Sequence, residues 1–574
     1  MAVKASKPKK QKALPVEVLE LDYQLAELPS SQHRAGLAGL VLMVEHLKRQ
    51  GTNKGVCELT RLDEQGATLR VDRVGLESLF DVTYAAVRGQ RESYKKAKKA
   101  KTKEEIPPIG EELREITDPK TGVTKTVTVY FYPTCTPKGA FLAEYDPTAN
   151  DAGDGLWVKL WRDMVWGILR KKPTTRTPYT ARADRKPTKD ADQAWAALLK
   201  PSHHTVDLPS TYYIGARAAN AEMIPFKDRA RLQFLLHFWS FVAQIYVPAV
   251  MALDKEMGSK LDLNRGYALA VPDVARLQTF CAALPRVLEH GRGMERTGYR
   301  PRDSVITVAA EGALDLYDRL TRQIALQTGG DRTSRLVLGI DVIHVAEAGD
   351  DVVIKSTSRI DPDLNQADEY ARIRSYLWNP LFRKQRVLNI LAEPERRRPK
   401  RPWYAGFDSL LTRTPHELGF SADTFKHDAR ESFKYEENLM DENNNPATLA
   451  QEVAEDGADA SAPPNATPAV LVYKVIGNYL RRKLKSKHDV DWEDIAKGKI
   501  SKEDYHDLRR KLARDAFFAV RSRTGEDFVD YFASTLCSVP QNLREEHFAL
   551  LAHELHHNGE EVRTLTMLAL SARG

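Results

Sequence analysis

The sequence predicts an irregular α+β body followed by an all-α helical bundle. Strand and helix patterns alternate irregularly through residues 1–440, whereas residues 469–574 carry helix patterns with no competing strand pattern. Between them, residues 441–468 contain no Lys or Arg and are rich in Asn, Asp, Ala and Pro. Such a segment buries too little apolar surface to offset its chain entropy. We therefore predict a body (1–440), a flexible acidic linker (441–468) and a bundle (469–574).

Two helices are predicted within the body. The first begins after Ser30, because apolar residues recur at helical spacing between Leu37 and Leu47, and Gly51 suits its C-terminus. The second covers residues 228–246, where apolar side chains occupy nearly every side of a helix. A helix that is apolar all round is typical of a central, buried position.

Strand patterns occur at residues 123–132 and 267–271 and in the pair 335–345 and 352–357. The turn sequence Ala-Gly-Asp-Asp at 348–351 predicts that the last two strands form a hairpin. These strands, mixed with helices of different lengths, make the body α+β.

The C-terminal region carries the signals of a small helical bundle. An acidic pair, Glu503 and Asp504, is typical of a helix start, and Gly525 and Pro540 are typical of helix breaks. The predicted helices cover residues 470–484, 501–521, 525–537 and 543–570. Short helices joined in this way pack as a bundle.

Composition favours a cytoplasmic protein. The most apolar stretch, 234–247, has 14 residues, fewer than the roughly 20 that a membrane span needs. The lysine-rich residues 1–12 are followed by no apolar segment of a secretory signal. The four cysteines lie far apart and form no CxxC pair, which indicates reduced thiols rather than zinc ligands. We expect no membrane association.

The distribution of charge favours a polyanionic partner. Lys and Arg total 86 against 79 Asp and Glu, a formal charge of +7. A single basic run usually indicates a solvated face, but several runs with neighbouring aromatic residues are typical of proteins that bind nucleic acid. The basic runs lie at residues 4–12, 95–103, 162–189, 396–401 and 481–487.

One motif suggests an alternative function. His553-Glu554-Leu555-His556-His557 matches the H-E-x-x-H pattern, in which two His on one helix face bind zinc and Glu acts as a base. A catalytic zinc needs a third protein ligand, and the 17 residues after His557 offer no further His. A zinc-dependent hydrolase is therefore the alternative, and an exposed helix face is the preferred interpretation.

Other signals of enzyme chemistry are missing from the sequence. His427-Asp428 and His488-Asp489 are isolated dipeptides without the further His and Asp ligands of a metal-dependent nuclease. The sequence contains no G-x-x-x-x-G-K-[ST] phosphate loop and no G-x-S-x-G nucleophile turn. We expect no catalytic residue, no metal and no cofactor.

Two stretches carry a family resemblance. Residues 28–40 (LPSSQHRAGLAGL) and residues 213–226 (YIGARAANAEMIPF), which run into LLHFWSFVAQIYVP, are similar to the large subunit of type I CRISPR surveillance complexes, called Cascade. The similarity is to the Myxococcus-type branch, grouped with type I-B systems. Pro272-Asp273-Val274, Phe280 and the C-terminal helices extend the resemblance over most of the chain.

The resemblance implies a non-catalytic subunit that lies near the 5′ handle of the CRISPR RNA. Such a subunit recognises the protospacer-adjacent motif in duplex DNA, helps to open the duplex and recruits a separate helicase-nuclease. Its partners are the CRISPR RNA, the target duplex, the displaced strand, and the backbone, handle-binding and small subunits. Related complexes recruit transposition proteins instead, so a scaffold of a guide-directed transposition complex is a further alternative.

The bundle of this family resembles the small subunit and lines the path of the displaced strand. In type I-B systems the bundle is also produced separately from an internal start. Here Met440 is the sole methionine between Met294 and Met567, and it stands just before the predicted linker. We expect Met440 to be such a start, although a chance methionine is the alternative.

Candidate contact residues follow from the basic runs and the resemblance. The predicted phosphate contacts are Arg170, Lys171, Lys172, Arg176, Arg182, Arg185 and Lys186 in the body and Arg481, Arg482, Lys485, Arg509, Arg510 and Arg514 in the bundle. Base edges are read by Arg, Asn and Gln side chains on turns that enter a groove. The predicted motif-reading residues are Arg217 and Asn220 in the turn 215–220, supported by Gln32 and Arg34. A structural turn or helix cap is the alternative for Arg217 and Asn220.

Overall fold

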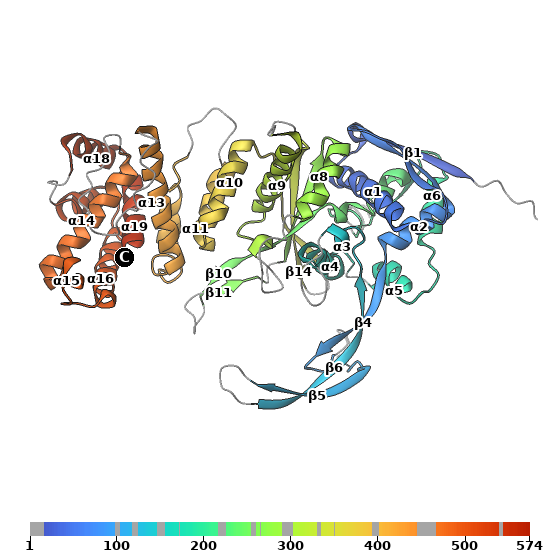
Figure 1. The fold of residues 1–574 in the computed structure, drawn as a ribbon, viewed down its shortest axis with the longest axis horizontal. Helices are drawn as coiled ribbons and strands as arrows, with labels where there is room; N and C mark the ends of the chain where they lie inside the picture. The colour runs from blue at the N-terminus through green and yellow to red at the C-terminus, as the bar shows by residue number, and fades with distance from the viewer. Residues whose placement is uncertain are drawn as a thin grey trace, which may run out of the picture. The chain divides into compact units, whose positions relative to one another are not determined.

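The structure is a computed structural model, and its described residues form two compact units (Figure 1). Unit 1 comprises Met1–Val247 and Gly266–Pro362, and unit 2 comprises Pro248–Arg265 and Asp363–Gly574. Unit 1 holds the larger sheets and unit 2 is mainly helical, which confirms the predicted fold class. The described residues are 17–97, 104–117, 124–145, 155–170, 173–209, 211–215, 226–253, 260–263, 266–289, 302–329, 335–348, 351–392, 401–444, 466–538 and 543–574.

A five-stranded sheet with strand order β13-β9-β12-β14-β15 forms the centre of unit 1. Strand β12 is a nearly continuous apolar run and pairs antiparallel with both β9 and β14, so it is buried along almost its whole length. Strands β14 and β15 form the predicted hairpin, and the predicted strand at 267–271 is confirmed as part of β12. The bounds are β9 Gln244–Pro248, β12 Tyr267–Val274, β13 Val305–Ile306, β14 Val337–Ala348 and β15 Asp351–Ile360.

Helix α1 (Ser31–Gln50) packs against β12 and is buried for most of its length. It ends as predicted at Gly51, which adopts a left-handed conformation with φ 63°. Two glycines allow a neighbouring segment to approach its axis. A Cβ at Gly36 would lie 2.5 Å from the carbonyl oxygen of Leu235, and one at Gly39 would lie 2.4 Å from that of Phe238. No side chain fits at either position without movement of the backbone.

The single helix predicted for residues 228–246 is wrong. This region contains the short helix α7 (Ala230–Leu235), a 3₁₀ turn (Trp239–Phe241) and then strand β9. All five residues of β9 are buried within the sheet. A segment that is apolar on all sides satisfies a buried strand as well as a buried helix, and periodicity does not distinguish them.

Two further antiparallel sheets belong to unit 1. The first has strand order β1-β3-β2 and is followed by helix α2; the second has strand order β4-β6-β5 and is largely exposed on β5. Strand β6 contains most of the strand predicted at 123–132; residue 123 lies outside the described residues. The bounds are β1 Val18–Gln24, β2 Cys57–Leu62, β3 Gly66–Asp72, α2 Arg73–Thr83, β4 Ala86–Ser93, β5 Gly110–Thr117 and β6 Thr124–Pro137.

Shorter elements complete unit 1. A short two-stranded sheet joins β7 to β8, and α4 continues into a π-helical turn at Val165–Leu169. The remaining elements are α3 Leu142–Tyr145, α4 Leu156–Met164, α5 Thr177–Ala183, α6 Asp190–Leu198, β7 Thr205–Asp207, β8 Lys227–Arg229, α8 Leu277–Glu289 and α9 Glu311–Thr328.

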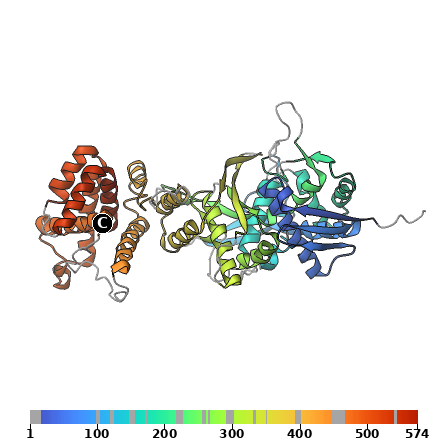
Figure 2. The ribbon, with the colours of Figure 1, turned by 90° about the horizontal axis from the view of Figure 1, so that it is seen from above.

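Unit 2 gathers its helices around α19 (Gly559–Arg573), which Figure 2 shows among the other orange and red helices. Residues 562–572 of α19 are all buried. The unit also contains the small hairpin β10-β11. The other bounds are β10 Val250–Ala252, β11 Lys260–Asp262, α10 Leu364–Tyr376, α11 Pro380–Ala392, α12 Phe407–Arg413, α13 Asp423–Asn444, α14 Pro468–His488, α15 Glu493–Ala496, α16 Lys502–Arg521, α17 Gly525–Tyr531 and α18 Glu545–His557.

The helices predicted at 470–484, 501–521 and 525–537 correspond to α14, α16 and α17 with the π-helical turn that follows it. The single helix predicted at 543–570 is wrong, because α18 and α19 are separate helices. The chain leaves helical geometry at Asn558, with φ −128° and ψ 38°, immediately before Gly559. Asn and Gly are both poor helix formers, and together they favour a break.

The compact units differ from the predicted domains, because α12 and α13 pack with the C-terminal helices. Phe433 of α13 stacks on Tyr473 of α14 with ring centres 4.6 Å apart, and Phe420 lies 4.5 Å from Phe517 of α16. Of the predicted linker, residues 441–444 belong to α13 and residues 445–465 lie outside the described residues. No helix in the part of the chain that the structure describes has the length and apolarity needed to cross a membrane.

The close approach of the Phe238 backbone to α1 can be tested by substitution. Gly39→Ala places a Cβ against the carbonyl oxygen of Phe238, so backbone must move, and such overpacking costs about 1–3 kcal/mol. We expect a lower urea midpoint for unfolding of the full chain. Gly167→Ala is the control, because a Cβ there has no neighbouring atom within 4 Å. Equal losses of unfolding free energy in the two variants would contradict the role of Gly39.

Candidate nucleic-acid interface

Arg170 does not fit its predicted role as a phosphate contact. Its side chain is buried, with 6% of the residue exposed, and its guanidinium lies 4.1 Å from the centre of the Tyr212 ring. A guanidinium over an aromatic face is held by cation–π attraction, which is stronger where water is excluded. A buried cation in this position cannot reach a DNA backbone outside the protein. We therefore assign Arg170 to the interior of unit 1.

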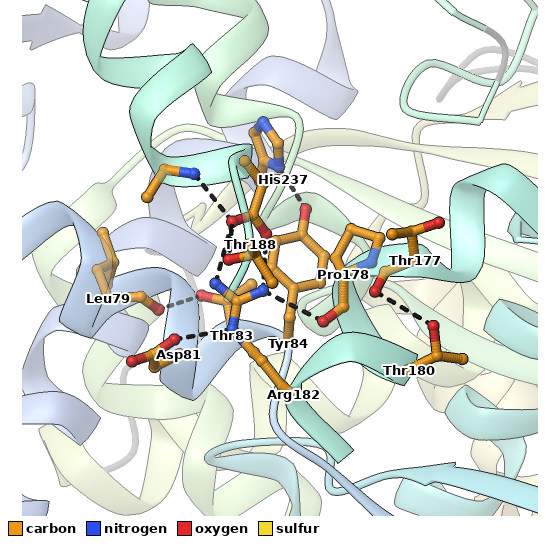
Figure 3. Close-up of polar contacts among 12 residues, drawn as sticks. Leu79, Asp81, Thr83, Tyr84, Thr177, Pro178, Thr180, Arg182, Thr188 and His237 are labelled. Atoms are coloured by element: carbon orange, nitrogen blue, oxygen red, sulfur yellow. Dashed lines mark hydrogen bonds and ion pairs between the residues drawn. The ribbon is translucent and has the colours of Figure 1, made fainter. Parts of the chain in front are cut away.

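Arg182 is also held within the protein (Figure 3). Its guanidinium donates to the carboxylate of Asp81 at 2.9 Å and to that of Asp190 at 2.6 Å, and it donates to the carbonyl oxygen of Pro178 at 3.2 Å. The side chain is 9% exposed. With two carboxylates already paired to it, Arg182 joins α2, α5 and α6 and carries little free charge for a phosphate.

A buried Tyr–His pair lies beside Arg182 (Figure 3). Tyr84 and His237 are hydrogen-bonded to each other in the interior of unit 1. Burial, aided by the positive charge of Arg170, lowers the pKa of His237 to about 3. His237 is therefore neutral at physiological pH and serves packing rather than proton transfer to solvent.

The rest of the first basic run is divided between interior and surface. Arg176 is half-buried, with its guanidinium 4.6 Å from the centre of the Trp166 ring, and it donates to the carbonyl oxygen of Trp166. Arg185 is exposed and Lys186 is 71% exposed, so both present their charge to solvent. The predicted contacts Lys171 and Lys172 lie outside the described residues.

The bundle presents more of its predicted cations. Arg481 and Lys485 are exposed on α14, and Arg510 and Arg514 are exposed on α16, which packs beside α14. Two of the four have acidic neighbours. Lys485 pairs with Asp489 and Asp491, at 3.3 and 3.2 Å, and Arg510 pairs with Asp507 at 3.1 Å.

Two predicted bundle contacts are less accessible, and one aromatic side chain was not predicted. Arg482 is half-buried and Arg509 is buried. Phe518 is exposed on α16, one turn after Arg514. Exposed cations beside an exposed aromatic ring are the combination that single-stranded nucleic acid binds. The sequence could have identified Phe518 by its spacing of four residues from Arg514.

Gln32 and Arg34 bind other parts of unit 1. The buried amide of Gln32 donates to the carbonyl oxygen of Ile214 at 3.0 Å and accepts from its N–H at 3.1 Å. Arg34 donates to the buried carboxylate of Asp273 at 2.6 Å and to the carbonyl oxygen of Leu25 at 3.1 Å. Both side chains are therefore occupied. Their partners Ile214 and Asp273 lie far away along the chain, so the sequence alone could not identify these hydrogen bonds.

The turn predicted to read bases is described only at its start. Gly215 has φ 110°, which favours glycine and is consistent with a turn after Ile214. Arg217 and Asn220 lie outside the described residues. Their roles as motif-reading residues stay a prediction.

Two family models cover most of the chain. Residues 56–330 match the type I-B CRISPR Cas8b N-terminal domain, and residues 337–573 match the type I-B CRISPR Cas8b C-terminal domain. The chain belongs to the Cas8b family. Cas8b is the large subunit of type I-B CRISPR systems, so the resemblance seen in the sequence is confirmed. No curated protein matches the chain.

The two Cas8b matches meet between residues 330 and 337, within unit 1. The C-terminal family model therefore includes the hairpin β14-β15 as well as the helices of unit 2. The family domains and the compact units divide the chain at different places.

The H-E-x-x-H motif of this Cas8b chain lies on the surface. His553 and His557 are exposed on α18 with ring centres 4.1 Å apart, and Glu554 belongs to the same helix. Among the described residues, no three His, Cys, Asp or Glu side chains are placed to hold one metal ion. Among the described residues, a zinc ion at this motif would therefore have His553 and His557 as ligands and no third protein ligand.

The His427-Asp428 dipeptide holds helices together. Asp428 of α13 is fully buried and accepts from the backbone N–H groups of Trp378 and Asn379, at 2.9 and 2.7 Å, just before α11. His427 stacks on the exposed ring of Trp378 with centres 4.3 Å apart. Burial raises the pKa of Asp428 to about 6, although these hydrogen bonds oppose the shift.

The raised pKa predicts a pH dependence of stability. The Asp428 carboxyl titrates near 3.9 in an unfolded chain, so the folded protein binds more protons between about pH 4 and 6. The contribution of Asp428 to the stability of unit 2 therefore falls as pH rises through this window, by at most about 3 kcal/mol, and does not change above it. Asp428→Asn removes the titration and should flatten this slope in urea unfolding measured from pH 4 to 8.

Asp489→Asn is the matched control, because it changes the exposed carboxylate of the second His-Asp dipeptide. This variant should keep the wild-type slope. Identical slopes in the wild type and Asp428→Asn would show that Asp428 has an ordinary pKa.

Proposed function

We propose that this chain is the non-catalytic large subunit of a type I-B RNA-guided DNA surveillance complex. In it, the chain recognises the protospacer-adjacent motif in duplex DNA, aids strand separation and stabilises the displaced strand. The observation that carries the proposal is the match of both Cas8b domain models over residues 56–330 and 337–573. Its proposed partners are the CRISPR RNA, target DNA, the other Cascade subunits and a recruited effector, either a helicase-nuclease or a transposition adaptor.

The exposed cations support a role in gripping the displaced strand. Backbone phosphates are held by Lys and Arg without sequence preference, and the release of counterions drives this binding. Arg510, Arg514 and Phe518 lie exposed on one helix, α16, so they offer both phosphate contacts and a ring. Stacking of a base on an aromatic ring contributes about 1–3 kcal/mol.

Motif reading is proposed for Arg217 and Asn220, with Lys171 and Lys172 on nearby phosphates. Bidentate contacts from Arg to guanine and from Asn to adenine contribute about 1–3 kcal/mol of discrimination each. Arg185 and Lys186 are exposed in unit 1 and supply charge for the duplex backbone. Arg170 and Arg182 are not part of this proposal, because their contacts are internal.

Assembly provides the direct test. Co-expression with CRISPR RNA and the other subunits of its system should yield a complex that retains this chain. That complex should bind duplex DNA with a preference for one flanking motif, measured by titration of labelled duplexes. A complex that forms without this chain and shows the same motif preference would contradict the proposed function.

Charge removal on α16 should weaken binding of the displaced strand. Each lost phosphate contact lowers the slope of log affinity against log salt by about 0.7 on single strands. Arg510→Gln with Arg514→Gln should therefore lower this slope by about 1–2 for an opened target, equally for all motifs. Lys497→Gln is the control, since Lys497 is an exposed cation of the same unit outside α16 and pairs with Glu493 at 2.8 Å. An unchanged slope in the double variant would remove α16 from the interface.

A further inference from the structure

Strand β5 is an open edge of the sheet β4-β6-β5 (Figure 1). Among the described residues it pairs with β6 and with no other strand, so one row of its backbone N–H and C=O groups has no strand partner. The other edge strand, β4, is joined to the end of α5, because Arg88 donates to both carboxylate oxygens of Asp184, at 2.6 and 2.8 Å. One edge of the sheet is thus attached within unit 1, and the other is exposed.

Strand β5 lacks the features that usually protect an edge from pairing with another chain. Native edge strands are kept apart by short length, proline, lysine or bulges. Strand β5 has eight residues, none of them Pro or Lys, and its register with β6 is unbroken. Leu113 in this strand is 72% exposed. A long, regular edge with an exposed leucine is suited to accept an added strand.

Leu113 lies between two acidic side chains on one face of β5. Glu111, Leu113 and Glu115 are each two residues apart, so they project from the same face at intervals of about 6.8 Å. Their cross-strand partners on β6 are uncharged: Tyr130, Thr128 and Thr126. This face of β5 therefore presents an apolar side chain with one carboxylate on either side.

Both acids present their charge to solvent. Glu111 and Glu115 are exposed, and in the part of the chain that the structure describes neither forms an ion pair. The opposite face of the strand differs, because Glu112 pairs with Arg114 at 3.0 Å. The negative charge of β5 is thus concentrated on the face that carries Leu113.

This charge pattern selects the kind of partner. Opposite charges directly across two strands are favourable, and like charges there are unfavourable. A nucleic acid is repelled, since its backbone is a polyanion. A second β5 aligned on Leu113 would place glutamate opposite glutamate in either strand direction, so self-pairing is also unfavourable. A basic segment of another protein satisfies both the edge and its charge.

We propose that β5 is a strand-addition site for an extended, basic segment of a partner protein. The segment places an apolar side chain beside Leu113 and a Lys or Arg beside each of Glu111 and Glu115, in the pattern basic-x-apolar-x-basic. The pattern is the same in both directions, so it fits a parallel or an antiparallel strand. Backbone hydrogen bonds supply affinity and the side chains supply selectivity. This protein interface is separate from the cationic surfaces proposed for nucleic acid.

Synthetic peptides test the site on the full chain alone. The basic probe is fluorescently labelled Thr-Lys-Thr-Val-Thr-Lys-Thr, and the acidic probe has Glu in place of both lysines. We expect fluorescence anisotropy to show at least tenfold tighter binding of the basic probe. Glu111→Lys with Glu115→Lys should reverse this preference, because the charges across the two strands are exchanged.

A charge-matched variant separates the site from net charge. Glu17→Lys with Glu77→Lys makes the same change in charge at two other exposed positions of unit 1, so it should keep the wild-type preference. Basic probes N-methylated at alternate residues test strand pairing, because an added strand directs alternate N–H groups toward its neighbour. One of the two alternate sets should lower affinity at least tenfold, and the other should lower it less than threefold.

The assembled complex tests the partner. A photo-cross-linking amino acid is placed at position 113 of the full chain, which is co-expressed with CRISPR RNA and the other subunits, and position 77 serves as the control. We expect position 113 to cross-link to another polypeptide, at a segment in which mass spectrometry finds the pattern basic-x-apolar-x-basic. The peptide assay does not require the complex, so its result is independent of the proposed function.

The inference would be overturned by equal affinity for the two probes, by an unchanged preference in the Glu111 and Glu115 variant, or by equal effects of the two N-methylated sets. In the complex, three results at position 113 would overturn it: a cross-link to nucleic acid, a cross-link to a second copy of this chain, or no cross-link above that at position 77.

Discussion

Unit 1 depends on the distance between α1 and the backbone at residues 235–238. Gly36 and Gly39 allow the carbonyl oxygens of Leu235 and Phe238 to approach where any Cβ would collide with them. Helix α1 also packs on β12 of the central sheet. One helix thus fixes the sheet, the turn after α7 and, through its first turn, Ile214 and Asp228. Segments far apart in sequence are brought together by the small size of two residues.

The basic character of the chain divides into two physical roles. Arg170, Arg176 and Arg182 place their guanidinium groups on aromatic rings or carboxylates inside unit 1. Arg is suited to this role because its planar, weakly hydrated group stacks and forms several hydrogen bonds. Arg185, Lys186 and the exposed cations of α14 and α16 carry charge at the surface. Net charge and local runs therefore overstate the cationic area of the surface, because several of these cations are buried.

Local patterns predicted much of the fold and little of the site. Helix α1 and the hairpin β14-β15 follow from spacing and turn chemistry, which are encoded within a few residues. The region 228–246 was missed because an apolar run satisfies a buried strand as well as a buried helix, and only tertiary packing decides between them. The break at Asn558 is different, because the Asn-Gly pair signals it locally and the apolar spacing on either side concealed it. Gln32 was recognised as important, but its partner Ile214 is 182 residues away, and no periodicity indicates such a pairing.

The order of segments along the chain has a practical consequence for protein engineering. Residues 248–265, which contain β10 and β11, belong to unit 2, although they interrupt the strands of unit 1 between β9 and β12. Each unit is therefore assembled from two separate stretches of polypeptide. An exchange of unit 2 between homologous proteins needs a second pair of junctions around this hairpin. A chimera joined at residue 362 alone would combine a hairpin from one parent with helix α11 from the other, across a contact that the two had never shared.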